Sequence, residues 1–290
     1  MGLGFELGLG LELGLGLGLV PEIYHDSMIV RGSGPPLLLV PGIQGRWEWM
    51  RPAVGALSAS FTVASFSLIG EWGTGVRLRA DTPFDRHVEQ VDRVMDRLGW
   101  GGAVVCGVSY GGAVAVRYAA VRPERVRALV LASAIGPRWR LNDVERRWAS
   151  SPWLSLPAFA AGAPFRLWPE IRAACPGPLR ACAAAARYLG LVAAAPTLPS
   201  HLANRVRCLD GHDLAGDARA VRAPALVITG ERDLDRVVPV DGTLEYVDLI
   251  AGASQRTLPG TGHIGLVTKP REFAALIAGF AGGLPATSRA

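Results

Sequence analysis

Short apolar runs alternate with helix-like segments along most of this chain, and this alternation limits the folds that it can adopt. Leu37 to Val40 is fully apolar and ends at Pro41-Gly42, as is typical of a strand buried on both faces. Residues 84–98 instead repeat apolar side chains at helical spacing and stop at Gly99. Further strand candidates are 23–31, 61–68, 103–108, 126–132, 225–229 and 255–258, and further helix candidates are 110–121 and 271–280. Such alternation predicts an α/β fold with a mostly parallel, doubly wound sheet.

One long stretch breaks this rhythm. Residues 137–220 are rich in Ala, Pro, Trp and Arg and contain no clear strand, but they include helix-like pieces such as 179–188. A chain of 290 residues can bury one large core together with a smaller appended unit. We therefore expect a core formed by residues 21–136 and 221–290, with residues 137–220 inserted as a helical cap.

The first twenty residues differ from the rest. Residues 2–19 are three copies of a Gly/Leu-rich hexapeptide, and Glu6 and Glu12 within them argue against a membrane span. No Lys or Arg precedes Arg31, which argues against a secretory signal. We expect residues 1–20 to be a low-complexity tail outside the fold, with a secreted protein as the minor alternative.

Composition excludes several classes of function. Half of the residues are hydrophobic and 19% are charged, which is typical of a globular protein. The net charge is +5, but the arginines are scattered and Lys269 is the single lysine, so we expect a solvated surface and no nucleic-acid partner. The four cysteines have neither metal-ligand spacing nor the density of a disulfide framework, which favours a reducing cytoplasm and no metal.

The segment GVSYGG places Ser109 between a strand candidate and a helix candidate. A sharp strand-to-helix turn forces such a serine into an unfavourable backbone conformation that exposes its hydroxyl, and it requires tiny neighbours such as Gly107 and Gly111. The helix behind the serine also directs free N–H groups towards any anion formed there. We predict that Ser109 is a nucleophile; the alternative is a structural turn in a glycine-rich chain.

A serine nucleophile needs a base, and position favours one histidine. His263 follows the last strand candidate in LPGTGHIG, where a loop reaches the carboxyl edge of the sheet. The other histidines lie near the start, in the 84–98 helix candidate or in the insertion: His25, His87, His201 and His212.

The base in turn needs a carboxylate. Asp233 in ITGERDLD follows the strand candidate 225–229 at the same edge, so we predict that it orients His263. Asp235 and Glu231 are rivals, because a slip of one or two residues in the loop exchanges them. The segment after 126–132 offers no carboxylate.

The chain order Ser109, Asp233, His263, with a strand-turn-helix at the serine, resembles the α/β-hydrolase superfamily. The resemblance covers about residues 22–285 and rests on VPGIQG, GVSYGG, GERD and GTGH taken together. It implies an oxyanion hole made by the backbone N–H groups of Ile43 and Tyr110, and it requires no metal or cofactor.

This chain departs from the family pattern before the oxyanion loop. It carries Pro41-Gly42 where many relatives carry His-Gly, which changes what braces the loop but leaves its backbone donors. Gln44 and Trp47 follow, together with Trp49, and we expect Gln44 and Trp47 to line a substrate pocket. Packing is the alternative for the tryptophans.

Serine at this position also narrows the chemistry. Dehalogenases and epoxide hydrolases of the superfamily are expected to carry aspartate there, so Ser109 predicts acyl transfer. The leading hypothesis is a serine hydrolase of a small ester or related acyl compound. A C–C bond hydrolase, a lactonase and an acyltransferase remain open on the same residues, as does a non-catalytic ligand-binding member of the fold.

Overall fold

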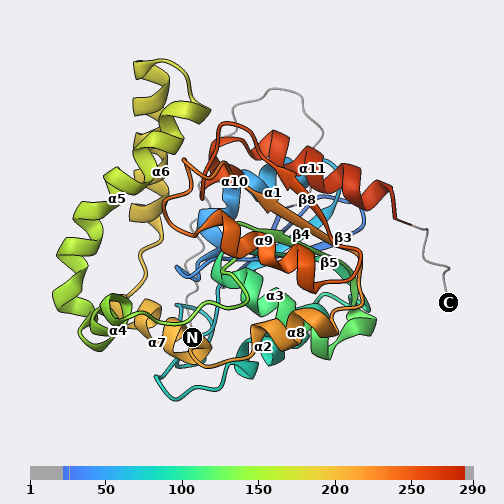
Figure 1. The fold of residues 1–290 in the computed structure, drawn as a ribbon. Coiled ribbons are helices and arrows are strands. Elements are labelled where there is room, and N and C mark those ends of the chain that lie inside the picture. The colour runs from blue at the N-terminus through green and yellow to red at the C-terminus, as the bar shows by residue number, and fades with distance from the viewer. Residues whose placement is uncertain (1–21, 26, 285–290) are drawn as a thin grey trace, which may run out of the picture.

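The computed structural model describes residues 22–25 and 27–284 (Figure 1), so the expected tail at residues 1–20 lies outside the described residues. Within them, eight strands form one sheet in the order β1-β2-β4-β3-β5-β6-β7-β8. The first two pair antiparallel and β2 pairs antiparallel with β4, whereas every pair from β4 to β8 is parallel. The expected mostly parallel sheet is confirmed. The strands are β1 (Glu22–His25), β2 (Met28–Arg31), β3 (Pro36–Val40), β4 (Thr62–Phe66), β5 (Ala103–Val108), β6 (Val126–Ala132), β7 (Ala225–Thr229) and β8 (Ser254–Thr257).

Helices connect these strands and cover both faces of the sheet (Figure 1). The α-helices are α1 (Arg51–Leu57), α2 (Asp85–Arg97), α3 (Tyr110–Val121), α4 (Asp143–Ser150), α5 (Pro152–Ala174), α6 (Pro178–Ala194), α7 (Pro199–Leu209), α8 (Leu214–Ala220), α9 (Val240–Leu249), α10 (Gly265–Thr268) and α11 (Pro270–Gly282). Two short 3₁₀ helices are η1 (Trp47–Met50) and η2 (Pro123–Arg125).

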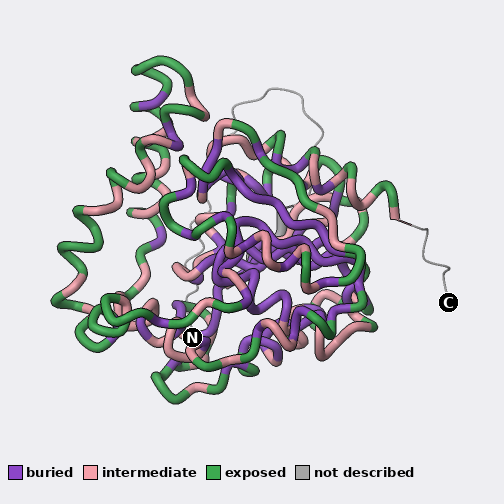
Figure 2. The backbone as a smooth tube through the Cα atoms, viewed as in Figure 1, coloured by how far each residue is buried: buried purple, intermediate pink, exposed green. Residues whose placement is uncertain are grey.

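The two faces of the sheet carry separate apolar clusters. On one face α2, α3 and α8 pack against the side chains of alternate strand positions, such as Leu38 and Val105. On the other face α1, α10 and α11 cover the intervening positions, such as Leu39 and Cys106. Figure 2 shows the buried core following the sheet. This two-sided burial explains why β3, β5 and β7 are continuous apolar runs.

The three central strands end at the same edge of the sheet. In the parallel register, Val40 of β3 is opposite Gly107 of β5, and Val108 of β5 is opposite Ala132 of β6. The chain therefore leaves these strands side by side, and the loops that follow them meet above one edge. The open α/β sheets of this type place their ligands at that edge.

All of the regular secondary structure in residues 137–220, the stretch expected to form a cap, is helical. α4, α5, α6 and α7 follow β6 without an intervening strand, and Asn142 begins α4 with a capping box that includes Glu145. α8 packs against α3 and contributes Leu214 and Ala218 to the core. α5, α6 and α7 reach the core through Ile171, Ala181 and Leu209.

Helix α5 contains three internal prolines, Pro157, Pro164 and Pro169. A proline has no N–H to donate to the carbonyl four residues earlier, so each one interrupts the hydrogen bonds of the helix. The carbonyl freed by Pro169 belongs to Phe165, and it accepts a long hydrogen bond of 3.4 Å from Nη1 of Arg236 in the core.

None of the described helices is long and apolar enough to span a membrane by itself. The pair α6 and α7 meets the criteria of length and composition when taken together, but the two helices meet at an angle of 88°.

Helix α3 lies unusually close to the sheet because of its glycines. A Cβ added at Gly111 would overlap the carbonyl oxygens of Val40 and Pro41, and one added at Gly112 would overlap the side chain of Ala134. By contrast, a Cβ at Gly279 in α11 would meet no atom within 4 Å.

The space around Gly111 and Gly279 predicts that alanine has opposite effects on the free energy of unfolding at these two positions. We expect Gly111→Ala to lower the free energy of unfolding by ~2 kcal/mol or more, because backbone atoms must move to admit the methyl group. Gly279→Ala should raise it by about 0.5–1 kcal/mol through helix propensity. Urea unfolding of both variants measures the difference, and equal effects would contradict the close approach of α3.

Candidate active site

Ser109 occupies the turn between β5 and α3 in a backbone conformation that L-residues rarely adopt. Its φ is +53° and its ψ is −118°, and its backbone N–H donates to the carbonyl of Ala132 over 2.9 Å. Its own carbonyl accepts from the backbone N–H of Gly112 (2.9 Å) and of Ile135 (3.2 Å). The conformation is therefore fixed by neighbouring strands rather than by local preference, as is common for strained residues at functional sites.

The glycines around Ser109 are needed for space. A Cβ at Gly107 would overlap the carbonyl oxygen of Gly111, which lies one turn further along the elbow. The loop after β3 also reaches this point, because a Cβ at Gly42 would lie 3.4 Å from Cβ of Ser109. The predicted nucleophile and the predicted oxyanion loop are thus brought together.

His263 lies in the loop after β8, and a carboxylate stands beside it. Nδ1 of His263 is 3.4 Å from Oδ2 of Asp235, whose side chain is almost fully buried. Oδ1 of Asp235 accepts from the backbone N–H groups of Val237 (3.0 Å) and Val238 (2.9 Å), which fixes the orientation of the carboxylate. The structure therefore pairs the predicted base with an oriented acid.

The acid is not the residue that the sequence favours. Asp233 is exposed, and the prediction that it orients His263 is wrong in this structure. The reason is a tight turn after β7, in which the carbonyl of Glu231 accepts from the backbone N–H groups of Leu234 and Asp235. This turn directs Asp233 to solvent and returns the chain to the sheet edge at Asp235. The other rival, Glu231, accepts from the backbone N–H of Gly260 and so braces the neighbouring loop.

Electrostatics agree with an ionised Asp235. Burial by itself would raise the pKa of this carboxyl, but the hydrogen bond and charge interaction with His263, together with the two backbone donors, hold its pKa below the ordinary value.

The remaining described histidine side chains have partners elsewhere. Nδ1 of His201 is 3.1 Å from Glu71, Nε2 of His212 is 2.7 Å from Asp217, and Nδ1 of His87 is 3.2 Å from a backbone carbonyl. The side chain of His25 lies outside the described residues. Among the described histidines, His263 is the one that accompanies Asp235 at the edge of the sheet.

The two residues expected to contact substrate, Gln44 and Trp47, lie in different surroundings. Gln44 lies beside the oxyanion loop, because its Oε1 would be 3.3 Å from a Cβ at Gly42. Trp47 is buried in the apolar core beneath α1, so packing accounts for its placement, and its substrate contact stays a prediction. Trp49 links the loop to the cap, since its Nε1 donates to the carbonyl of Ala195 (2.9 Å).

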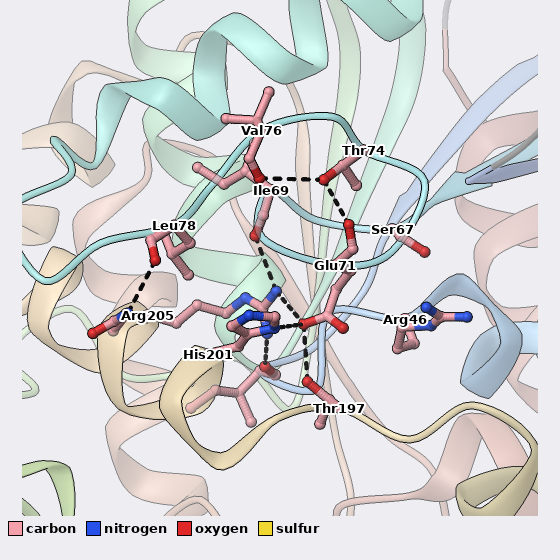
Figure 3. Close-up of polar contacts among 12 residues, drawn as sticks. Arg46, Ser67, Ile69, Glu71, Thr74, Val76, Leu78, Thr197, His201 and Arg205 are labelled. Atoms are coloured by element: carbon pink, nitrogen blue, oxygen red, sulfur yellow. Dashed lines mark hydrogen bonds and ion pairs between the residues drawn. The ribbon is translucent and has the colours of Figure 1, made fainter.

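A buried arginine of α7 holds the predicted oxyanion loop, and the sequence alone does not identify it. Arg205 of α7 is fully buried; its Nη1 donates to the carbonyl of Ile43 (2.8 Å) and its Nη2 to that of Ile69 (3.1 Å) (Figure 3). A Cβ at Gly45 would overlap the guanidinium, so the glycine makes room for it. Nothing local in the sequence signals this role, because arginine in a helix is ordinarily exposed.

The charge of Arg205 is balanced by Glu71, which is equally buried. Oε1 of Glu71 accepts from Arg205 (2.7 Å) and from Thr197 (2.8 Å), and it faces Nδ1 of His201 (3.1 Å) (Figure 3). Three residues of the cap thus converge on one carboxylate oxygen from the loop after β4. The cluster joins α7 to both loops on this side of the candidate active site.

A second cap residue reaches the other side. Glu170 of α5 is fully buried, and both of its carboxylate oxygens accept from the backbone N–H of Ile264 (2.9 and 3.1 Å), the residue after His263. Burial raises the pKa of Glu170 from 4.5 to about 7, although the backbone donors and His263 act in the opposite direction. Its carboxyl therefore changes charge close to neutral pH.

No group of three or more His, Cys, Asp or Glu side chains within the described residues is arranged to hold a metal ion.

Comparison with known proteins decides the family. A family model described as the alpha/beta hydrolase fold matches residues 35–270. This chain belongs to the α/β-hydrolase family. The match spans β3, the turn at Ser109, α4 to α7 and the loop of His263.

This α/β hydrolase is similar in sequence to several known proteins over most of its length. It is 29% identical over 271 residues to a 2-hydroxymuconate semialdehyde hydrolase of Pseudomonas sp., covering 88% of each chain. It is 26% identical to a poly(3-hydroxyalkanoate) depolymerase of Ectopseudomonas oleovorans, covering 84% of this chain and 83% of the other. The solved enol-lactonase of Burkholderia xenovorans shares the fold with a TM-score of 0.70, 22% identity and coverage of 90% and 100%.

The buried Arg205–Glu71 pair predicts a dependence between two substitutions. We expect Arg205→Met to lower the free energy of unfolding by about 3–5 kcal/mol, because it leaves the charge of Glu71 buried without its partner. Glu71→Gln combined with Arg205→Met should cost less than Arg205→Met alone. Asn204→Ala, a neighbour that loses only its hydrogen bond to the carbonyl of Leu78, serves as control with a loss of about 1 kcal/mol. Urea unfolding compares the four chains, and a double variant that is less stable than Arg205→Met alone would contradict the pairing.

Glu170 predicts a dependence of stability on pH. The pKa of Glu170 is about 7 in the folded chain, and the ordinary value of 4.5 applies to the unfolded chain. Between these two pH values the folded chain therefore holds a proton that the unfolded chain has lost. This contribution is complete below pH 4.5 and is lost as pH rises to 7. Relative to Glu170→Gln, the wild type should lose up to roughly 3 kcal/mol across this window. Denaturant unfolding of both proteins at several pH values measures the difference, and parallel curves would refute it.

Proposed function

We propose that this chain is a serine hydrolase that cleaves a small carboxylic ester or related acyl compound through an acyl-enzyme on Ser109. The observation that carries the proposal is the strained backbone of Ser109, fixed at the start of α3 on the edge where His263 and Asp235 are paired. Family membership supports hydrolase activity in general, and the ester bond is the more specific part of the proposal.

In the proposed first step Oγ of Ser109 attacks the carbonyl carbon of the substrate while its proton passes to Nε2 of His263. Because Nδ1 of His263 faces Asp235, the tautomer with the proton on Nδ1 leaves Nε2 as the base. Asp235 stabilises the imidazolium that forms, and His263 then gives the proton to the departing alcohol. Water, activated by His263, cleaves the acyl-enzyme in the second step.

The negative oxygen of the tetrahedral intermediate needs donors that are already in place. The backbone N–H of Tyr110 opens α3, so the positive end of that helix acts at the same point. The loop that carries Ile43 lies against Ser109, and Arg205 fixes the carbonyl of Ile43. Donors of this kind contribute about 3 kcal/mol each to stabilising the transition state.

A second candidate uses the same residues to cleave a carbon–carbon bond next to a carbonyl. The similarity to 2-hydroxymuconate semialdehyde hydrolase over 88% of the chain favours this candidate. A lactonase and an acyltransferase follow the same first step and differ in the leaving group or the acceptor. Assays with p-nitrophenyl esters of increasing chain length and with 2-hydroxymuconate semialdehyde distinguish ester hydrolysis from cleavage of a carbon–carbon bond.

The assignment of the acid gives the sharpest test of the mechanism. We expect Asp235→Asn to lower kcat by a factor of about 10⁴, because the tautomer of His263 is no longer fixed. Asp233→Asn, which changes an exposed side chain two residues away, should leave kcat within a factor of about two. Steady-state kinetics on the best ester measure both, and the reverse order would make Asp233 the acid.

Labelling separates an enzyme from a ligand-binding protein. A fluorophosphonate probe should label the wild type, and Ser109→Ala should abolish the label. A folded wild type that is neither labelled nor active on any of these substrates would refute the proposed function.

A further inference from the structure

Apolar side chains gather on the exposed surface of α5 and α6. The most exposed are Leu154 (85%), Phe165 (78%) and Leu179 (86%). We call this set the cap hairpin surface; it consists of Trp153, Leu154, Leu156, Phe159, Phe165, Trp168, Leu179 and Leu189. Figure 2 shows these two helices mostly exposed, in contrast to the buried sheet.

Such a concentration needs an explanation. Single exposed apolar side chains are ordinary on a protein surface, but a group of eight on two helices that pack against each other is typical of an interaction site. Most of the large apolar side chains that are exposed among the described residues belong to these two helices. They extend beyond the sheet and its flanking helices at the left of Figure 1.

The exposed charges of α5 and α6 are all positive. α5 and α6 contain one carboxylate, Glu170, which is buried against Ile264. The exposed charges of the two helices are Arg172, Arg180 and Arg187, and within the described residues none of the three has an ion-pair partner. Arg166 is half-buried and lies over the ring of Phe159 at 4.8 Å from its centroid.

We propose that the cap hairpin surface docks onto the surface of an anionic lipid bilayer. Leucine and phenylalanine side chains would enter the boundary between headgroups and acyl chains, and tryptophan is favoured at this depth because its ring is amphipathic. The arginines would remain among the headgroups, where each is attracted by anionic lipid. The combination of exposed apolar side chains with cations alone fits this partner.

A second copy of the chain fits this surface less well. A symmetric dimer would use the same surface on both copies, so it would gather Arg172, Arg180 and Arg187 of both copies in one interface. The hairpin offers no exposed carboxylate to pair with them. Such an interface would bury cations against cations, whereas an anionic bilayer neutralises them.

The proposed contact is interfacial rather than spanning. None of the described helices is long and apolar enough to cross a membrane alone, and α5 is interrupted by three prolines. The end of α5 contacts Ile264 beside His263, so the helix that carries much of this surface is joined to the loop of the candidate active site. The proposal itself does not require the proposed hydrolase reaction.

Vesicle flotation with the full chain tests the proposal. We expect binding to vesicles of phosphatidylcholine mixed with phosphatidylglycerol, with an affinity at least roughly tenfold higher than for phosphatidylcholine alone and reduced by salt. Phe165→Asp combined with Leu179→Asp should weaken binding by at least roughly tenfold, because two large apolar side chains no longer enter the bilayer. Arg180→Gln combined with Arg187→Gln should reduce the preference for phosphatidylglycerol.

Matched controls separate the surface from net charge and folding. Ala275→Asp combined with Gly279→Asp adds the same two negative charges to an exposed face of α11 and should leave binding within about twofold. Circular dichroism and thermal unfolding verify that both double variants fold, and fluorophosphonate labelling reports on the active site separately.

Three outcomes would overturn the proposal. These are no binding of the wild type to either vesicle, equal binding of the Phe165→Asp/Leu179→Asp variant and the wild type, and equal binding to both lipid compositions. Light scattering without lipid gives a fourth, because a dimer that the Phe165→Asp/Leu179→Asp variant dissociates would assign the surface to a second copy of the chain.

Discussion

The geometry at the carboxyl edge depends on the close approach of α3 to β3 and β5. Gly107 and Gly111 permit this approach, since a side chain at either position would overlap backbone atoms. The approach brings Ser109 under the loop after β3 and holds its backbone in a strained conformation by bonds to β6. The proposed nucleophile and the proposed oxyanion donors therefore both depend on these two glycines for their positions.

Two buried charges then connect the cap to this edge from opposite sides. Arg205 reaches the loop of Ile43, and Glu170 reaches the backbone beside His263. Each is a side chain that ordinarily stays in water, and each is buried where it satisfies backbone groups of a loop. α5 and α7 are therefore part of the scaffold of the candidate site.

The sequence predicts the strands and the elbow better than it predicts the loops. The bounds of β5, α3, β6 and β7 agree with the expected ranges, because continuous apolar runs between turn residues admit few alternatives. Position along the chain does not separate Asp233 from Asp235, because it does not reveal how tightly the turn after β7 winds. Arg205 and Glu170 carry no local signal, since their burial depends on partners more than ninety residues away.

The prolines of α5 give the cap a mechanical property that its length alone does not suggest. A regular helix of this size resists bending through its continuous ladder of hydrogen bonds, but α5 lacks three of them, at Pro157, Pro164 and Pro169. Its base is anchored just beyond the last gap, where Glu170 meets Ile264. The helix is therefore most easily bent at Pro157 and Pro164, while its end at Glu170 stays attached to the loop of His263.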